Sequence, residues 1–185
     1  METQAMNYQI REMRLEDAPS LIRYFLNSDE SFLRGMGVEP SKLPKEADWL
    51  KLLEEDYQRP LEERHFYYLL WEIDGTPVGH GNINCIEYGK TAIMHLHVWV
   101  PDLRKQGLGT QFLKASIQKF FDKFQLQELR CQPHQGNPAP NKTLPKVGFQ
   151  FEKTYEPTPG WINYPHRVNL YSLQREDWES QYEQL

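Results

Sequence analysis

The chain has 185 residues, of which 39% are hydrophobic and 13% aromatic, and its formal net charge is −5 at pH 7. This length suits a single domain, 1–185, with one core, and the apolar content excludes a disordered chain. No apolar run approaches the roughly 20 residues of a spanning helix, the start lacks the apolar region of a signal peptide, and negative charge disfavours general nucleic-acid binding. We therefore expect a cytoplasmic protein whose partners include neither membranes nor nucleic acids.

The first third of the chain predicts one strand and two helices. Residues 8–14 alternate weakly between polar and apolar side chains, as a strand does, and residues 15–26 carry apolar side chains at helical spacing. An irregular segment rich in Gly and Pro precedes a second helix at about residues 46–57. Acidic residues crowd residues 46–63, which indicates either a solvated helix face or long-range attraction of a cationic substrate.

The middle of the chain predicts hairpins and a long helix. Residues 65–73 are rich in aromatic and aliphatic side chains, and the Asp74-Gly75 pair that follows them is typical of a hairpin turn. The return strand runs to about residue 87, and another strand spans residues 92–100. Apolar residues then recur at helical spacing from about 105 to 124.

The last third predicts strands at residues 126–132, 149–155 and 168–173, with a short helix after Pro140 that ends at Gly148. The order of elements predicts an α/β fold of the α+β kind, in which helices flank one mixed, mostly antiparallel sheet. The core is expected to span about residues 8–174, and residues 175–185 read as a polar helix or tail. Cys85 and Cys131 lie in strand-like stretches and are expected to be buried thiols.

A glycine motif between a strand and the long helix carries the most chemical information. Two glycines two residues apart at a helix start leave backbone N–H groups uncovered, and these groups, with the helix dipole, suit a phosphate. The spacing fits neither a P-loop nor a dinucleotide fingerprint. A flexible helix start without a ligand is the alternative. The motif consists of Arg104, Lys105, Gln106, Gly107, Leu108, Gly109 and Thr110.

This motif resembles the signature Q/R-x-x-G-x-G/A of the GNAT acetyltransferase superfamily, which Arg104, Gly107 and Gly109 match. The family often has an Asn after its fifth strand and a Gly-Phe pair about twelve residues later, as Asn137 and Gly148-Phe149 do here. The opening strand and helix also look like those of the family, so the resemblance covers nearly the whole chain. It is weakest at residues 27–64 and after residue 155.

The resemblance implies that acetyl-coenzyme A is the cosubstrate and that a homodimer forms. The motif backbone, residues 104–110, would hold the pyrophosphate. The fourth and fifth strands would splay apart and admit the pantetheine arm, which would pair with the strand like an added strand. Asn137 would either lie beside the cofactor or only cap the following turn. The strand residues implied in cofactor binding are Val98, Trp99 and Val100.

His95 and His97 are candidate general bases, because acetyl transfer to an amine requires the amine to lose a proton. They lie two residues apart on a strand and therefore share one face, and imidazole titrates near neutral pH. The position of His95 is similar to that of a histidine in the arylalkylamine and siderophore hydroxylysine acetyltransferase branches. Hydrogen-bonded core histidines are the alternative. No third ligand stands at a recognisable spacing for a metal.

The general acid is not evident from the sequence. Many family members carry a Tyr seven residues after the motif Asn, where this chain has Leu144. Another tyrosine would have to replace it, or the thiolate leaves unassisted; the candidates are Tyr88, Tyr155 and Tyr164. The aminoglycoside 6′ and siderophore branches usually carry an acidic residue where Gln132 stands, which argues against transferring either substrate.

The sequence therefore predicts an acetyl-CoA-dependent N-acetyltransferase that acts on a primary amine by direct attack in a ternary complex, with a small cationic amine favoured. One alternative is a protein N-terminal or lysine acetyltransferase, and another is a non-catalytic acyl-CoA-binding module. A small amine suits a closed pocket and a protein acceptor an open groove, so the conformations of residues 28–45 and 156–166 distinguish them. Residues of the second segment either line the acceptor pocket or only pack; they are Trp161, Tyr164, His166 and Arg167.

Overall fold

The computed structural model describes residues 7–103 and 108–182, with only the backbone of Tyr182 described. Seven strands form one sheet in the order β1-β2-β3-β4-β5-β7-β6, and the pairing of β4 with β5 is its parallel one. This confirms the predicted mixed, mostly antiparallel sheet. The strands are β1 (Tyr8–Glu12), β2 (Phe66–Ile73), β3 (Thr76–Glu87), β4 (Thr91–Val98), β5 (Glu128–Cys131), β6 (Gln150–Tyr155) and β7 (Val168–Gln174).

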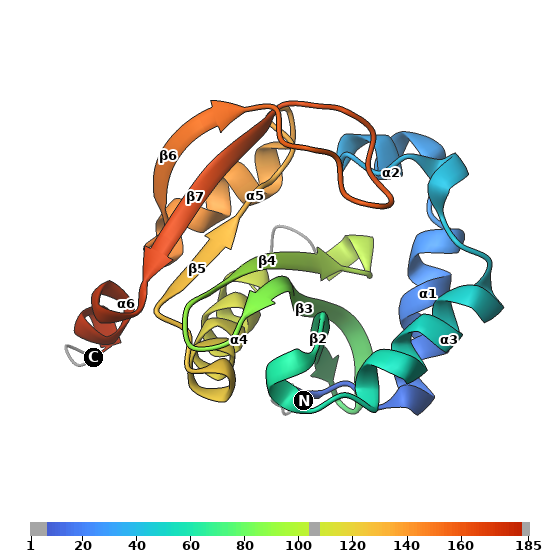
Figure 1. Cartoon of the computed structure of the whole chain (residues 1–185), viewed down its shortest axis with the longest axis horizontal. Coiled ribbons are helices and arrows are strands. Elements are labelled where there is room, and N and C mark those ends of the chain that lie inside the picture. The colour runs from blue at the N-terminus through green and yellow to red at the C-terminus, as the bar shows by residue number, and fades with distance from the viewer. Residues whose placement is uncertain (1–6, 104–107, 183–185) are drawn as a thin grey trace, which may run out of the picture.

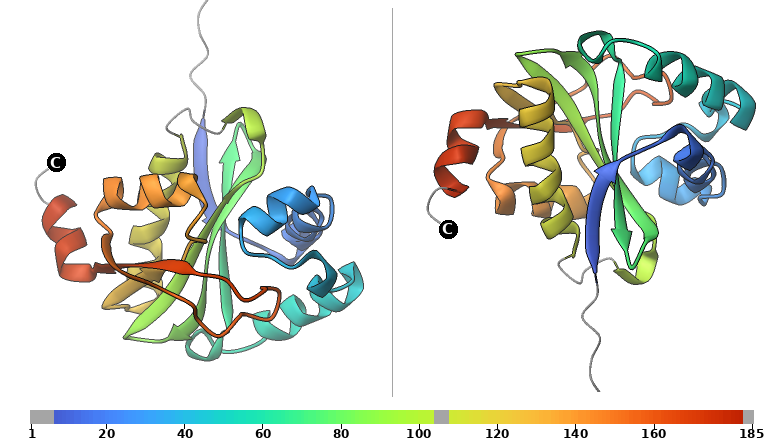
Figure 2. Two further views of the ribbon diagram at one scale, coloured as in Figure 1. Left: turned by 90° about the horizontal axis from the view of Figure 1, so that it is seen from above. Right: turned by 90° about the horizontal axis from the view of Figure 1, so that it is seen from below.

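Helices cover both faces of the sheet (Figures 1 and 2). One face carries α4, α5 and α6, and the opposite face carries α1, α2 and α3. No helix within residues 7–103 and 108–182 combines the length and apolar character needed to cross a bilayer. The α-helices are α1 (Ala18–Leu26), α2 (Glu30–Gly35), α3 (Glu46–Tyr57), α4 (Leu108–Phe124), α5 (Pro138–Thr143) and α6 (Arg175–Tyr182); the short 3₁₀ helices are Leu15–Asp17, Pro40–Lys42, Leu61–Glu63, Pro101–Leu103 and Leu144–Val147.

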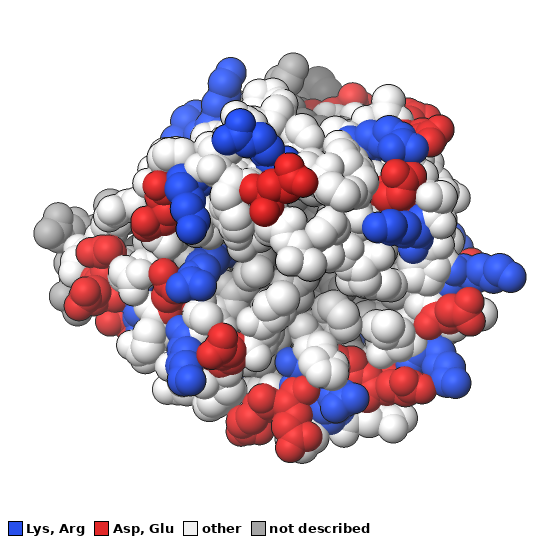
Figure 3. Space-filling view, turned by 45° about the horizontal axis from the view of Figure 1, so that its top comes forward, with Lys and Arg blue, Asp and Glu red and all other residues white. Residues whose placement is uncertain are grey.

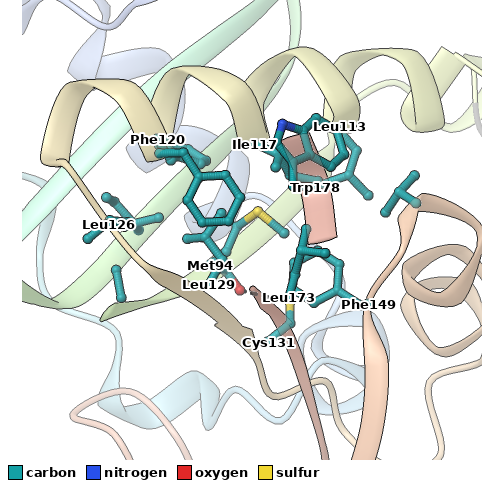
Figure 4. Packing of buried hydrophobic residues seen from close by; sticks show 14 of the residues in the cluster. Met94, Leu113, Ile117, Phe120, Leu126, Leu129, Cys131, Phe149, Leu173 and Trp178 are labelled. Carbon is teal, nitrogen blue, oxygen red and sulfur yellow. Dashed lines mark hydrogen bonds between the residues drawn. The ribbon is translucent and has the colours of Figure 1, made fainter. Parts of the chain in front are cut away.

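The larger core lies under α4 (Figure 4). Apolar residues recur along α4 at helical spacing, so that one stripe of the helix packs on β3, β4 and β5. Trp178 of α6 closes the end of this core, and its indole Nε1–H donates to Gln118 Oε1 at 2.7 Å. The polar C-terminal segment is therefore a helix anchored by one buried tryptophan.

The sheet opens between β4 and β5. The two strands pair only from Thr91–Glu128 to Ile93–Arg130 and then separate, as Figure 1 shows. At the point of divergence the Cys131 thiol donates a hydrogen bond to the Met94 carbonyl oxygen at 2.9 Å. The splaying that the family resemblance implied is thus present in this chain.

Several local expectations need correction. The segment expected to be irregular contains α2, and the helix expected after Pro140 already begins at Pro138. Proline suits the first helical position, because the N–H that it lacks would have no partner there. Cys131 is buried as expected, but Cys85 is exposed, because a register shift between β3 and β4 turns it outward with φ +47°. Both cysteines are free thiols.

Candidate active site

A cavity of about 520 Å³ occupies the gap between the splayed strands. Five consecutive residues of β4, from Met94 to Val98, line it, so the edge of this strand faces the cavity. Since α1 and α2 line one end and α4 and α5 the other, the cavity passes through the sheet from face to face. The remaining lining residues are Tyr24, Phe32, Met36, Leu103, Gly109, Thr110, Cys131, Gln132, Pro133, His134, Asn137, Ala139, Pro140, Thr143 and Lys146.

The first turn of α4 supplies one wall of the cavity. Gly109 and Thr110 line it, and an added Cβ on Gly109 would meet only Val98 Cγ2 at 3.8 Å. A helix start presents backbone N–H groups and the positive end of the helix dipole. Arg104, Lys105, Gln106 and Gly107 lie outside the described residues, so the expected pyrophosphate loop is described only from Leu108 onward.

The other predicted cofactor residues divide into two groups. Val98 lines the cavity, whereas the Trp99 indole turns away and donates from Nε1 to His80 Nδ1 at 2.8 Å. Val100 lies on the surface with 36% exposure. Asn137 lines the cavity and also caps α5, because its Oδ1 accepts from the Ala139 N–H at 3.3 Å. Capping and cofactor contact are therefore compatible for Asn137.

His95 and His97 both line the cavity, on the face of the sheet that α1 covers. A third histidine, His80, lies beside them, since β3 and β4 pair His80 with His97 and the two rings stack with centroids 4.6 Å apart. Sequence reasoning missed His80. It faces the same side as Asn82 and Asn84 in an alternating stretch of β3, and that alternation of polar side chains was the available signal.

Burial keeps His80 and His95 neutral near pH 7. It lowers the pKa of His95 to about 4 and, together with His97 and His95, lowers the pKa of His80 well below its usual range. The Trp99 indole can only donate, so His80 accepts at Nδ1 and carries its proton on Nε2. Within the described residues, His80 Nε2 and His95 Nε2 are buried without a hydrogen-bond partner. Buried polar atoms of this kind are typical of a site that receives water or a ligand.

Tyr24 of α1 is a cavity residue that sequence reasoning also missed. Its hydroxyl lies 3.4 Å from His97 Nδ1, and its ring stacks on Trp99 with centroids 5.8 Å apart. Tyr24 is an aromatic residue next to the buried stripe of α1, a position from which a side chain can reach the rim of a core. Tyr24 therefore joins the aromatic and imidazole cluster of the cavity.

The three tyrosines considered as acids lie elsewhere. Tyr164 donates from its hydroxyl to the Arg34 carbonyl at 2.8 Å, and Tyr88 lies beside Phe124 at the opposite end of β4. Tyr155 ends β6 and is also absent from the cavity lining. Leu144 is fully buried in the core under α4, so the position that often holds a tyrosine in the family faces the core in this chain.

The loop between β6 and β7 extends away from these strands and contacts α2 and the residues after it (Figure 1). We call this contact between residues 34–42 and 160–166 the clasp. Trp161, Tyr164 and His166 are not among the cavity-lining residues, which favours packing over a direct pocket role. The hydrogen bonds of the clasp are Glu39 N–H to Ile162 O (2.8 Å), Tyr164 N–H to Gly37 O (3.3 Å), Asn163 Nδ2 to Gly37 O (2.9 Å), Lys42 Nζ to Asn163 O (2.7 Å) and Tyr164 Oη to Arg34 O (2.8 Å).

The clasp contacts a residue of the cavity wall. The His166 ring stacks on His134, a lining residue, with centroids 5.0 Å apart. Gly37 adopts φ +85°, and a Cβ there would come within 2.4 Å of the His166 ring. Only glycine fits both the left-handed backbone and this close approach. The clasp therefore depends on Gly37 and holds the neighbouring Met36 toward the cavity.

Carboxylates are absent from the described cavity lining. The acidic residues of α3 lie on its outer side, except Asp56, which is buried and accepts from the backbone N–H groups of His65 and Phe66 at 2.9 and 3.0 Å. This arrangement favours a solvated helix face over a substrate-steering one. Nor does the described part of the chain bring three or more His, Cys, Asp or Glu side chains together as metal ligands.

Comparisons with known proteins agree with this geometry. The family model described as "Acetyltransferase (GNAT) domain" matches residues 8–150. No curated protein sequence matches the chain.

Several solved structures are similar in fold. Spermidine N-acetyltransferase from Vibrio cholerae, in complex with CoA and spermine, has a TM-score of 0.76 at 14% identity over 93% of this chain and 98% of its own. RimL, a ribosomal L7/L12 α-N-protein acetyltransferase in complex with coenzyme A, has a TM-score of 0.73 at 17% identity over 90% and 93%. Aminoglycoside acetyltransferase AAC(6')-Ib, in complex with coenzyme A, has a TM-score of 0.72 at 14% identity over 95% and 99%. These proteins are named for three different kinds of acceptor, and at such identities the likeness establishes the fold.

Proposed function

The chain belongs to the GNAT acetyltransferase family of acyltransferases, and from that premise we propose that it transfers the acetyl group of acetyl-CoA to the primary amine of a small molecule. The observation that carries the proposal is the cavity between β4 and β5, which is lined by residues of helices from both faces of the sheet. Two substrates can enter such a cavity from opposite ends and meet at its centre. Direct transfer in a ternary complex requires that meeting.

The cofactor would enter from the end formed by α4 and α5. The start of α4 would bind the pyrophosphate with backbone N–H groups of residues 104–110. The edge of β4 would hydrogen-bond the pantetheine arm as an added strand does, because residues 94–98 face the cavity instead of β5. The Asn137 side chain, at the start of α5, would lie beside the arm.

The amine nitrogen would attack the thioester carbonyl carbon. The C–N bond forms, the C–S bond breaks, the thiolate of coenzyme A leaves, and the nitrogen loses a proton to a base. His95 would be that base, because it lines the cavity and Nε2 has no partner within the described residues. The His95 pKa of about 4 makes it a weak base, but desolvation in the same cavity also lowers the pKa of the bound ammonium. His97, linked to Tyr24, would assist.

The clasp supports a small acceptor over a protein. A peptide acceptor requires an open groove between the α1–α2 side and the β6–β7 side of the sheet. Backbone hydrogen bonds from Glu39 to Ile162 and from Tyr164 to Gly37 cross that path. An extended peptide would have to break them, whereas a small amine would not.

Calorimetric titration with acetyl-CoA tests the cofactor site. Gly109→Glu places a carboxylate at the start of α4, where the phosphates are expected, and should abolish binding. Gly109→Ala is the matched control, since its Cβ meets only Val98 Cγ2 at 3.8 Å, and it should bind as the wild type does. Loss of binding in both variants, or binding in all three proteins, would contradict the assignment. Binding by the wild type without turnover of any amine would instead favour a non-catalytic acyl-CoA-binding protein.

A further inference from the structure

The structure points to a narrower substrate class, and the inference rests on the proposed function. We infer that the acceptor is a monoamine, with one primary amino group on an aromatic or aliphatic body, and that a second cationic group on the acceptor is rejected. The argument starts from the cavity end that α1 and α2 form, opposite the expected cofactor end.

Three side chains make up this end of the cavity. Tyr24 and Phe32 meet edge to face with ring centroids 6.4 Å apart, and the Tyr24 hydroxyl lies 3.9 Å from Met36 Sδ. Aromatic rings and a thioether present a polarizable apolar wall. Such a wall accepts an apolar body, and its described side chains offer a second ammonium aromatic rings, a thioether and one hydroxyl but no carboxylate.

The charges around the cavity agree with this apolar wall. An ammonium buried without a counter-charge is costly, so sites for polycations require carboxylates. In the part of the lining that the structure describes, the titratable residues are instead histidine, cysteine, tyrosine and lysine. Burial lowers the pKa of His95 to about 4, so its imidazole is neutral, not negative, at pH 7. Figure 3 shows one face of the molecule, where the charged side chains lie mostly around the rim and uncharged atoms occupy the centre.

The reacting amino group does not need such a counter-charge after transfer. It gives up a proton during transfer and becomes a neutral amide, so it needs no permanent counter-charge. The clasp also limits the length of the acceptor. Its hydrogen bonds fix Gly37, the residue next to Met36, at the apolar end of the cavity. Bulky tri- and tetra-amines would have to place their distal charges against this wall.

The test compares hexylamine with 1,6-diaminohexane, which differ by one terminal amino group. Each is titrated into the wild-type protein saturated with coenzyme A, together with 2-phenylethylamine, spermidine and kanamycin. We expect the monoamines to bind at least about tenfold more tightly than any polyamine. Tighter binding of 1,6-diaminohexane, spermidine or kanamycin would overturn the inference, and so would the absence of amine binding to protein that binds coenzyme A.

A matched pair of variants tests whether the selectivity for monoamines arises from the apolar wall. Met36 lines the cavity and is only partly buried, at the edge of the core on this face, so the two substitutions there share any loss of packing. Met36→Glu supplies the missing carboxylate and should remove or reverse the preference, whereas Met36→Gln, of equal size, should keep it. If both variants behave alike, the selectivity does not arise from this wall. Turnover with acetyl-CoA is measured separately: selective binding without acetylation would contradict the proposed function and leave the monoamine class standing.

Discussion

The two faces of the sheet are built on opposite principles. Under α4, the buried side chains are almost all apolar, and aromatic rings such as Phe120 and Phe124 fill the space. Under α1 and α3, the sheet presents His80, Asn82 and His97 among the aromatic residues. The first face gains stability mainly from the burial of apolar side chains, while the second keeps buried polar atoms whose partners are not all found within the described residues. Stability and chemistry therefore depend on different faces of the sheet, and substitutions should separate them.

The largest effect is expected on the apolar face. Phe120 is fully buried, so Phe120→Ala should lower the free energy of unfolding by about 3–5 kcal/mol. Phe151→Ala is the control, because Phe151 is 55% exposed, and its effect should be about 1 kcal/mol or less. Urea denaturation measures both. Equal losses in the two variants would mean that the core under α4 does not dominate stability.

On the polar face, activity should change more than stability. His95→Ala should lower kcat by about 100-fold, the usual contribution of a general base, while acetyl-CoA binding stays unchanged. His65→Ala is the control, since the side chain of His65 is 63% exposed and is not among the described cavity-lining residues. Steady-state kinetics of the two variants measure the effect. Full activity of His95→Ala would remove His95 as the base and leave His97 as the remaining candidate.

The buried histidines also predict how stability depends on pH. Their folded-state pKa values lie below the ordinary value of 6.5, at about 4 for His95 and well below the ordinary value for His80. The unfolded chain therefore binds more protons than the folded one in this range. The stability that these neutral histidines contribute is fully present above pH 6.5 and is lost as the pH falls toward 4. For His95, the loss in the free energy of unfolding is about 1–3 kcal/mol. Urea denaturation from pH 7.5 to 4.5 should show this fall, and His95→Asn should reduce its slope; an unchanged slope would contradict the assignment.

The smallest effect is expected at the clasp. Gly37→Ala forces a side chain onto φ +85° and into the His166 ring, at a cost of about 1–2 kcal/mol. KM for the amine should rise while the affinity for acetyl-CoA stays the same. Gly35→Ala is the control, because an added Cβ there has no atom within 4 Å. A change in acetyl-CoA affinity alone would show that the clasp acts on the cofactor end instead.

The sequence predicted those features that depend on local patterns. The Asp74-Gly75 turn, the bounds of α3 and the apolar stripe of α4 follow from turn chemistry and periodicity, and the structure has them all. The short helix α2 was missed, because its six residues hold one buried side chain and no clear period.

The parts of the site that were missed depend on contacts between distant residues. The meeting of His80 with His97 depends on the register of two strands, and a register shift near Cys85 hides that register from the sequence. Tyr24 reaches the cavity because α1 packs across β4. The clasp joins segments more than a hundred residues apart, as the bond from Asn163 to Gly37 illustrates.

The clasp also bears on the order in which the protein is made. A ribosome releases the α1–α3 side of the chain long before residues 160–166 emerge, at about 5–20 residues per second. Contacts that close such long loops form late, because the chain entropy is lost before the contacts compensate for it. The acceptor end of the cavity thus remains unfinished until β6 and β7 have joined the sheet. A nascent chain that stops before residue 160 should therefore lack a complete acceptor end of the cavity, even with β1 to β5 already in place.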